Sequence, residues 1–428
     1  MKLVAYLKTG PTASHAGGWR HPDADLHDIF DPARYEKLAR TLEDACFDAA
    51  FFADTFGIPD VYGDSFRTYI ERGGQISYLD PMLVLPLMAR VTTNLGLGAT
   101  LSTTFHPPYL LARMLASFDI LSNGRAAWNV VTSATDMEAR NFGLDALPAK
   151  DTRYDQADEV LEACNALWTC WDDDALVLDK MTGVFADPSK IRYADYAGQH
   201  VRTRGPLAMP RSPQVRPVFL QAGASERGRE FAARWAEMIF ASNYGLEDSV
   251  AFTADIKRRM VAHDRPPEQC DVLNSLGVVI GDTEQSAHDD ADRLNALADS
   301  DLVLAHNSTM LGADLARHRS PEAVAAAQGG AGISGIDATV RHRAAAEGIS
   351  YAAAARRPRS VMVGTATTIA DRMQALFEAK ACDGFVLWPT VSPTMFERFG
   401  AEVVPELQRR GLVQREYGPG TLREKLRR

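Results

Sequence analysis

The stretch LSNGRAAWNVVTSATD, residues 121–136, holds a turn, a strand and a polar edge in succession. Asn123 and Gly124 tolerate positive φ, so they favour a turn. The small and aromatic residues that follow predict a buried strand over residues 126–131. Hydroxyl side chains occupy most of residues 132–135. Because binding and catalytic residues of parallel sheets gather where the strands end, this edge is a candidate site.

Seven further apolar runs are similar to this strand, and amphipathic segments of helical period separate them. Strands with near-continuous apolar cores are typical of a parallel sheet that is buried on both faces. Eight strand–helix units predict an α/β fold, a (β/α)8 TIM barrel. An open doubly wound sheet would favour a G-x-G-x-x-G motif after the first strand, and none follows Leu7. The predicted strands cover residues 3–7, 49–53, 95–101, 126–131, 217–221, 238–241, 274–280 and 384–388.

Three segments, residues 8–30, 171–216 and 301–359, are longer than ordinary connections. We interpret the chain as one domain, residues 1–428, with these insertions at the C-terminal mouth of the barrel. Long segments at that end serve as lids and substrate walls. In the first insertion, the irregular spacing of His15, His21 and His27 favours a lid over a metal site.

Composition excludes several classes of protein. The formal net charge of −10 and the lack of a basic patch with interleaved aromatic residues argue against nucleic-acid binding. The basic runs at Arg356, Arg357 and Arg359 and at residues 423–428 are interpreted as solvated loop and tail. No apolar run is long enough to span a membrane. Five scattered cysteines without a C-x-x-C motif predict reduced thiols in the cytoplasm, with no structural metal.

Polar side chains follow several of the predicted strands. They are mostly hydroxyls, with one carboxylate at Asp54, and they form no Ser-His-Asp or Cys-His set. This pattern suits a polar organic cofactor better than hydrolysis. Gly223, Ala224 and Ser225 then precede a helix, where free N–H groups and the helix dipole favour a phosphate. The alternative is that Ser225 only caps this helix.

Several motifs together resemble one known family. SNGRAAWNVVTS resembles the strand-four signature of the bacterial-luciferase-like flavin monooxygenases, in the group of the nitrilotriacetate, pristinamycin-synthesis and dibenzothiophene-sulfone monooxygenases. Other similar motifs follow in the same order along nearly the whole chain: FFADT, LGLGATLSTTFHPPY, NFG, RYDQADEVLEACNALW, VFLQAGASERGREFAARWAE and CDGFVLWP. The resemblance implies a TIM barrel that holds FMN at its C-terminal mouth.

The resemblance also implies which residues contact FMN. The positions that match the group's contacts are Asp54, Thr100, Tyr154 and Ser225. The group has a histidine four residues before this tyrosine, where the present chain has Lys150. A lysine donates and carries a full charge, whereas a neutral histidine can also accept. Lys150 either contacts FMN or an anionic substrate, or points into solvent.

Two further expectations concern the strands themselves. Asn129 shares the inward face with Ala127 and Val131, and its amide could bind the pyrimidine edge of the flavin. The alternative is a satisfied internal polar residue. Arg125, at the other end of this strand, is expected to form an internal ion pair. The resemblance implies a cis peptide between Ala99 and Thr100.

The activity implied by the resemblance is oxygenation by a two-component system. A separate NAD(P)H:flavin reductase supplies reduced FMN, FMNH2, which reacts with O2 to form a flavin C4a-hydroperoxide. The substrate is a small organic molecule, attacked at a C–N, C–S or C–halogen bond, and a homo-oligomer is expected. The sequence identifies no catalytic residue. The alternatives are a deazaflavin-dependent oxidoreductase of the same superfamily and a noncatalytic flavin-binding protein.

Overall fold

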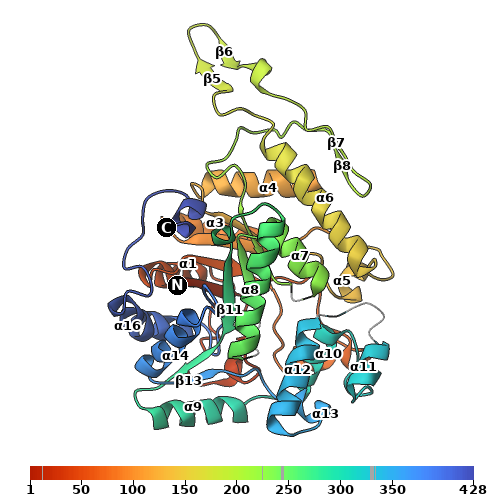
Figure 1. Cartoon of the computed structure of the whole chain (residues 1–428), viewed down its shortest axis with the longest axis vertical. Helices are drawn as coiled ribbons and strands as arrows, with labels where there is room; N and C mark the ends of the chain where they lie inside the picture. Colours follow the sequence, from red (N-terminus) through yellow and green to blue (C-terminus); the bar gives the residue numbers. More distant parts are fainter. Residues whose placement is uncertain (12, 224, 242–244, 328–331, 333) are drawn as a thin grey trace.

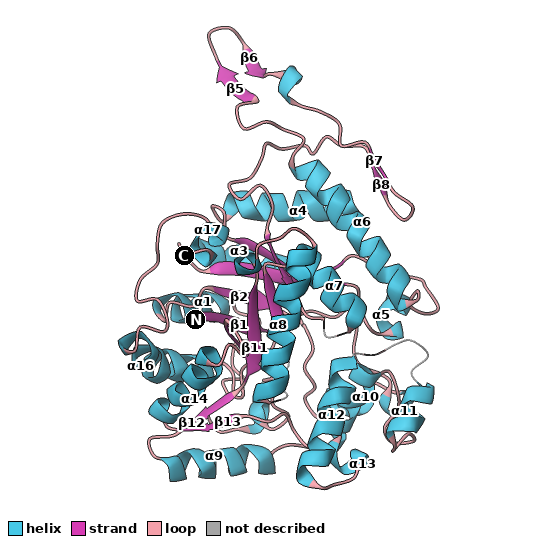
Figure 2. Cartoon of the chain, viewed as in Figure 1, coloured by secondary structure: helices cyan, strands magenta, loops and turns pink. Residues whose placement is uncertain are grey.

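The computed structural model describes residues 1–428 except 12, 224, 242–244, 328–331 and 333. Ala224, in the predicted phosphate seat, therefore lies outside the described residues. Eight parallel strands form a closed barrel with helices around it (Figures 1 and 2), so the predicted TIM barrel is confirmed. In order around the barrel, these strands are β1 (Lys2–Leu7), β14 (Gly384–Leu387), β11 (Asp271–Leu276), β10 (Met238–Ala241), β9 (Val218–Gln221), β4 (Ala126–Val131), β3 (Gly96–Ser102) and β2 (Ala49–Phe52).

One layer of helices returns the chain from the end of each strand to the start of the next. These helices are α1 (Pro32–Asp44), α3 (Pro81–Arg90), α4 (Pro108–Leu121), α6 (Lys150–Trp168), α7 (Glu226–Trp235), α8 (Leu246–Ala262), α14 (Ala366–Glu378) and, after β14, α15 (Thr394–Arg398) and α16 (Val404–Arg409). Asp-Pro pairs start two of them. Asp31 accepts from the backbone N–H of Ala33, and Asp80 from that of Met82, each at 2.8 Å. A proline at the next position costs no hydrogen bond there.

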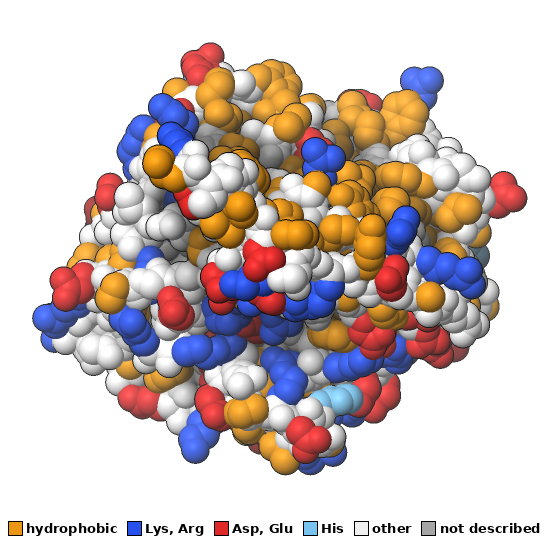
Figure 3. Space-filling view, turned by 90° about the horizontal axis from the view of Figure 1, so that it is seen from above, with side chains coloured by type: hydrophobic (Ala, Val, Ile, Leu, Met, Phe, Trp, Pro, Cys, Tyr) orange, Lys and Arg blue, Asp and Glu red, His pale blue; other side chains and the backbone are white. Residues whose placement is uncertain are grey.

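The segment of residues 171–216 lies at the opposite end of the barrel from the one expected. It follows α6, which has already returned the chain to the start of the strands, and Gln214 bonds the carbonyl of Ala126 at the beginning of β4. The segment forms two hairpins, β5 (Leu176–Asp179) with β6 (Val184–Ala186) and β7 (Tyr196–Ala197) with β8 (Arg202–Thr203). They project from the top of Figure 1. From that side, hydrophobic side chains cover much of the surface, and acidic and basic side chains are interspersed (Figure 3).

The third inserted segment lies at the mouth, as expected, because it follows barrel strand β11. It begins earlier than predicted, with β12 (Val278–Ile280), which pairs with β13 (Met362–Gly364) outside the barrel. Its helices are α9 (Glu284–Ala296), α10 (Ser300–Leu311), α11 (Pro321–Ala327), α12 (Ser334–Glu347) and α13 (Tyr351–Ala354). Two short helices precede barrel helices at this end: α2 (Arg67–Glu71) and α5 (Asp136–Asn141).

The single strand predicted over residues 274–280 is two strands, β11 and β12, which belong to different sheets. The chain leaves the barrel at Gly277. A Cβ atom at this glycine would lie 2.4 Å from the ring of Trp388, so no larger residue fits there. The apolar run continues across the break because both strands are buried.

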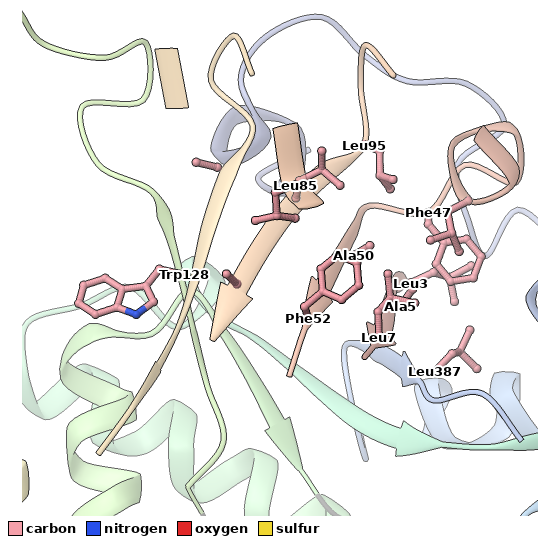
Figure 4. Close-up of a cluster of buried hydrophobic side chains, with 14 of the residues drawn as sticks. Leu3, Ala5, Leu7, Phe47, Ala50, Phe52, Leu85, Leu95, Trp128 and Leu387 are labelled. Carbon is pink, nitrogen blue, oxygen red and sulfur yellow. The ribbon is translucent and has the colours of Figure 1, made fainter. Parts of the chain in front are cut away.

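Alternate residues of β4 serve two hydrophobic clusters. Ala126, Trp128 and Val130 face outward into the cluster beneath the helices, part of which is shown in Figure 4. Ala127 faces the barrel interior together with apolar residues of six other strands. The indole N–H of Trp128 donates to the carbonyl of Leu101 at 2.9 Å, so this fully buried ring has its one polar atom satisfied. The predicted inward face of this strand is confirmed.

The last helix, α17 (Leu422–Leu426), closes the N-terminal end of the barrel. Leu422 and Leu426 pack into the interior cluster, and the backbone N–H of Leu422 donates to the carbonyl of Gly124 at 2.8 Å. Arg423 bonds the buried carboxylate of Glu237 at 2.6 Å. The basic tail is therefore part of the folded core, because its arginine neutralises a buried charge, and it is not only solvated.

Arg125 lies at the N-terminal end of β4 and is 4% exposed. The expected ion pair is absent among the described residues. Its guanidinium instead donates five hydrogen bonds of 2.7–3.0 Å, four to the backbone carbonyls of Ala89, Thr92, Leu95 and Ser122 and one to the hydroxyl of Thr92. These acceptors satisfy every N–H of the group, so no carboxylate is required.

The expected cis peptide between Ala99 and Thr100 is not present. Among the described residues, the cis bonds are Gly205–Pro206 and Ser392–Pro393.

Candidate active site

A cavity of about 710 Å³ opens at the carboxyl ends of the barrel strands. Its floor and walls come from the residues that follow β1, β2, β4, β9, β11 and β14, and α10 and α12 form the side away from the barrel. Four of the six predicted site residues line it: Asp54, Lys150, Tyr154 and Ser225. Seven Lys and Arg side chains line the cavity against two carboxylates, so it is basic within an acidic chain.

One end of the cavity lies where β4 and β9 end. Ser225 caps α7, and its Oγ accepts from the backbone N–H of Gly228 at 3.2 Å. A Cβ atom on Gly228 would lie 2.9 Å from the Tyr154 hydroxyl and 3.0 Å from the Ser225 Oγ. The two hydroxyls therefore converge beside Gly228, where any larger residue would place its Cβ atom too close to both. Burial raises the pKa of Tyr154, and a hydrogen bond to Ser225 opposes this shift.

Two cations border this end, and neither forms an ion pair with a carboxylate among the described residues. Arg153 is 3% exposed, and its buried Nε has no hydrogen-bond partner, although one Nη donates to the carbonyl of Pro148 at 2.8 Å. Burial lowers the pKa of Lys150, and the charge of Arg153 lowers it further. An anion held between the two side chains would offset both effects.

Thr100 and Asn129 do not line the cavity; they lie in the strands just below it. The Thr100 Oγ1 donates to the carbonyl of Phe52 and accepts from the Asn129 Nδ2, both at 2.9 Å. The other amide atom, Asn129 Oδ1, is buried without a partner. This amide is therefore only half satisfied.

Asp54 follows β2 and accepts from the backbone N–H of Thr55 at 2.8 Å. Burial raises the pKa of Asp54, while a hydrogen bond to Ser77 acts in the opposite direction.

The hydroxyls after β4 are organised by Glu138, which the sequence did not indicate. The hydroxyls of Ser133 and Thr135 donate to this carboxylate at 3.1 and 3.0 Å, and the backbone N–H of Ala134 donates at 3.3 Å. Glu138 thus fixes the loop that forms one wall of the cavity, with Ser133 at a φ of +58°. The stretch of residues 121–136 ends in hydroxyl side chains partly because they bind this buried carboxylate.

The opposite end of the cavity is formed at β1, β14 and β11. Lys8 follows β1, Trp388 follows β14, and Ser275 belongs to β11. Arg359 enters from the third inserted segment. Its Nη2 donates to the Ser275 hydroxyl at 3.1 Å, and its guanidinium lies 4.2 Å from the centre of the Trp388 ring.

A family model described as luciferase-like monooxygenase matches residues 11–384. The chain belongs to this family.

Its relatives span almost the whole chain. Dibenzothiophene-sulfone monooxygenase of Rhodococcus erythropolis is 41% identical over 436 residues, covering 100% of this chain and 96% of that protein. Nitrilotriacetate monooxygenase component A of Aminobacter aminovorans is 35% identical over 426 residues, covering 96% and 93%. A crystal structure of a riboflavin lyase with modified FMN and riboflavin matches with a TM-score of 0.90 and 31% identity, covering 100% of this chain and 95% of that one. The chain is thus a flavin-dependent monooxygenase.

Three lining residues of this luciferase-like monooxygenase were not singled out from the sequence, and two more, Arg357 and Arg359, were interpreted only as solvated loop. Arg153 lies next to Tyr154 in a quoted motif, and Lys8 directly follows a strand, so both carried a local signal. His306 carried none. Arg357 and Arg359 are exposed to solvent, as interpreted, but they also line the cavity, because the third inserted segment folds back over the mouth.

The histidines of the first insertion do not have the expected lid position. Lys8 is the one residue of that segment to line the cavity, as far as the chain is described. Within the same limit, no group of three His, Cys, Asp or Glu side chains could hold a metal ion, and no helix is both long and apolar enough to cross a membrane.

His306 of the monooxygenase makes folding stability depend on pH. Its Nδ1 lies 3.3 Å from the Tyr69 hydroxyl. Burial, with the charges of Arg359 and Lys8, lowers its pKa from 6.5 to about 4. Between these values the unfolded chain binds a proton that the folded chain does not, so the free energy of unfolding falls as pH decreases.

The unaltered protein should lose stability between pH 7 and pH 5. We expect His306→Gln to reduce this loss in the free energy of unfolding by about 2 kcal/mol. Urea unfolding at both pH values measures this difference. His27→Gln, which changes an exposed histidine, is the control and should leave the loss unchanged. Equal losses in the His306 variant and the unaltered protein would contradict the assignment.

Proposed function

We propose that this monooxygenase takes reduced FMN from a separate NAD(P)H:flavin reductase and uses O2 to oxygenate a small organic substrate. The bond attacked is a C–N, C–S or C–halogen bond. One observation supports this most: the Ser225 and Tyr154 hydroxyls converge at the N-terminus of α7, at the end of the cavity that Lys150 and Arg153 border.

The proposed phosphate seat uses Ser225, Tyr154 and Arg153. The N-terminus of α7 contributes a positive dipole and free N–H groups, and the unpartnered Nε of Arg153 is a donor without an acceptor. Lys150 supplies a second positive charge. A dianionic phosphate at this point would satisfy the donor and reduce the repulsion between the two cations.

The flavin ring would lie over the centre of the barrel mouth. Asn129 lies just below the cavity with an unpartnered amide oxygen, so it would bind the pyrimidine edge only if the flavin ring reaches down to the ends of β3 and β4, and Thr100 fixes the orientation of that amide. Asp54, with its raised pKa, borders the same region. When bound, reduced flavin supplies the electrons that activate O2. The chain's part is to orient the substrate and to exclude water, for which Ile76, Val131 and Met310 provide apolar walls.

The proposed partner is supported by a relative's printed name. Nitrilotriacetate monooxygenase is described through its component A, which implies a second component. By analogy, a flavin reductase would deliver reduced FMN to the present chain.

A homo-oligomer is also proposed. The β5–β6 hairpin projects from the barrel with Val177, Leu178, Met181, Val184 and Phe185 exposed. Exposed hydrophobic side chains on one projecting element favour contact with a further chain.

The test measures oxygen use and cofactor preference together. Purified protein is mixed with a generic flavin reductase, NADH and FMN, and uptake of O2 is followed with a panel of organic sulfur, nitrogen and halogen compounds. We expect at least one compound to give a product that carries ¹⁸O from ¹⁸O2. We also expect FMN to bind more tightly than FAD, and reduced FMN more tightly than oxidised FMN, because one phosphate seat serves a shuttled flavin.

The alternatives give different results. Hydride transfer from a reduced deazaflavin without O2 uptake would indicate the deazaflavin oxidoreductase. Tight flavin binding without any oxygenated product would indicate a noncatalytic binding protein. Equal affinities for FMN and FAD would contradict the single phosphate seat.

A further inference from the structure

The cavity has a second group of cations, far from the proposed phosphate seat. In the barrel order, β1 lies four strands from β9 and β14 lies four strands from β4, while β11, which carries Ser275, lies two strands from β9, so the two groups border different parts of the mouth. Lys8 and Arg359 form the second group. Lys150 and Arg153 form the first group, at the proposed phosphate seat. Because FMN has a single phosphate, which would bind there, the second group is left without an anion.

Neither cation of this second group is neutralised by the protein. Among the described residues, no carboxylate lies within 4 Å of Lys8 or Arg359. The charge of Lys8 acts to lower the pKa of Asp54, but the two side chains form no ion pair. Arg343 and Arg357, which also line the cavity, differ in this respect, because each lies within 4 Å of Glu347.

Arg359 is held in place for recognition. Its side chain is exposed to solvent, and the protein packed around it lowers its pKa by removing part of its hydration. Ser275 and the Trp388 ring fix the guanidinium by one hydrogen bond and one cation–π contact. A guanidinium so fixed presents its remaining N–H groups as a fork, which matches the geometry of a carboxylate or sulfonate.

Apolar side chains accompany the second cation group. Leu276, Val361 and Met362 line the cavity together with Trp388. A ligand that fits both features has a hydrophobic body and one anionic end.

We propose that the substrate is a hydrophobic organic acid, whose carboxylate or sulfonate binds Arg359 and Lys8 while its body lies over the flavin. This proposal rests on the proposed function, since it assigns the other cation group to the flavin phosphate. It excludes neutral hydrocarbons as the preferred substrates.

The test uses matched pairs of acid and neutral compound. Binding of naphthalene-2-carboxylate and naphthalene-2-sulfonate to the FMN-loaded protein is measured by calorimetry beside methyl naphthalene-2-carboxylate and methyl 2-naphthyl sulfone. We expect the anions to bind at least tenfold more tightly than their neutral partners. In Arg359→Gln, the anions should lose at least tenfold in affinity, and the neutral compounds should change by less than twofold.

Two controls separate this proposal from the proposed function. Arg356→Gln removes a nearby exposed charge that does not line the cavity, and it should behave as the unaltered protein. FMN affinity should stay within twofold in Arg359→Gln, which also shows that this variant is folded; Arg359→Lys should retain part of the preference. Equal binding of anions and neutral compounds, or no binding of any of them while FMN binds, overturns the proposal. Failure of the unaltered protein to bind FMN counts against the proposed function instead.

Discussion

Ser225→Asp is expected to weaken the binding of FMN more than a hundredfold. Two losses add. A charge-assisted hydrogen bond from the serine hydroxyl is worth roughly 1.5–3 kcal/mol. An aspartate about 4 Å from a dianionic phosphate adds repulsion of about 2 kcal/mol even at the dielectric constant of water. Fluorescence titration of reduced and oxidised FMN measures the loss.

The fold should survive this change, because aspartate is as good a helix N-cap as serine and can still accept from Gly228. Ser225→Asn is the matched control: it has nearly the same size, also caps, and carries no charge, so it should lose far less affinity. Ser225→Ala should lose roughly 1.5–3 kcal/mol. If Ser225→Asp left the affinity for reduced FMN unchanged, Ser225 would be only an N-cap, and the phosphate would have to bind elsewhere.

Arg125→Met is expected to lower the free energy of unfolding by about 4 kcal/mol. The guanidinium donates five buried hydrogen bonds, and methionine replaces its volume but none of its donors. Buried carbonyls that lose a charged donor pay a desolvation penalty that methionine cannot offset. Chemical denaturation measures the change.

Two comparisons make this result specific. Arg113→Met replaces an exposed arginine on α4 and should change stability by less than about 0.5 kcal/mol. FMN affinity should be unaffected by Arg125→Met, because Arg125 lies at the end of β4 away from the cavity. A small loss of stability, similar to that of Arg113→Met, would show that water replaces the guanidinium.

The barrel was predictable because each of its strands is a short apolar run whose start and end are set by nearby residues in the sequence. At β4 the predicted and observed bounds agree, since the Asn123-Gly124 turn sets the start and the hydroxyls set the end. The prediction of one strand over residues 274–280 was wrong because a continuous apolar run does not indicate that the chain changes sheets at Gly277. The end at which residues 171–216 lie follows from chain order, as a segment between a helix and the next strand must lie where strands begin.

The site was predictable only where its residues stand at strand ends. Asp54 lies two residues after β2 and Ser225 four residues after β9, and Lys8 directly follows β1. Arg359 and His306 reach the cavity through the tertiary placement of the third inserted segment, which leaves no periodicity in the sequence. Arg125 shows a different limit: sequence indicates that a buried charge must be satisfied, but not whether carboxylates or carbonyls satisfy it.

The helix that closes the N-terminal end of the barrel is synthesised after all eight barrel strands. Because α17 supplies Leu422 and Leu426 to the interior, the nascent protein holds its eight strands before it holds the plug that fills them. Until α17 is made, the lower interior is exposed to water, and the carboxylate of Glu237 lacks Arg423. Premature termination or proteolysis before Leu422 would therefore leave a complete ring of strands that cannot finish folding, a species prone to aggregation.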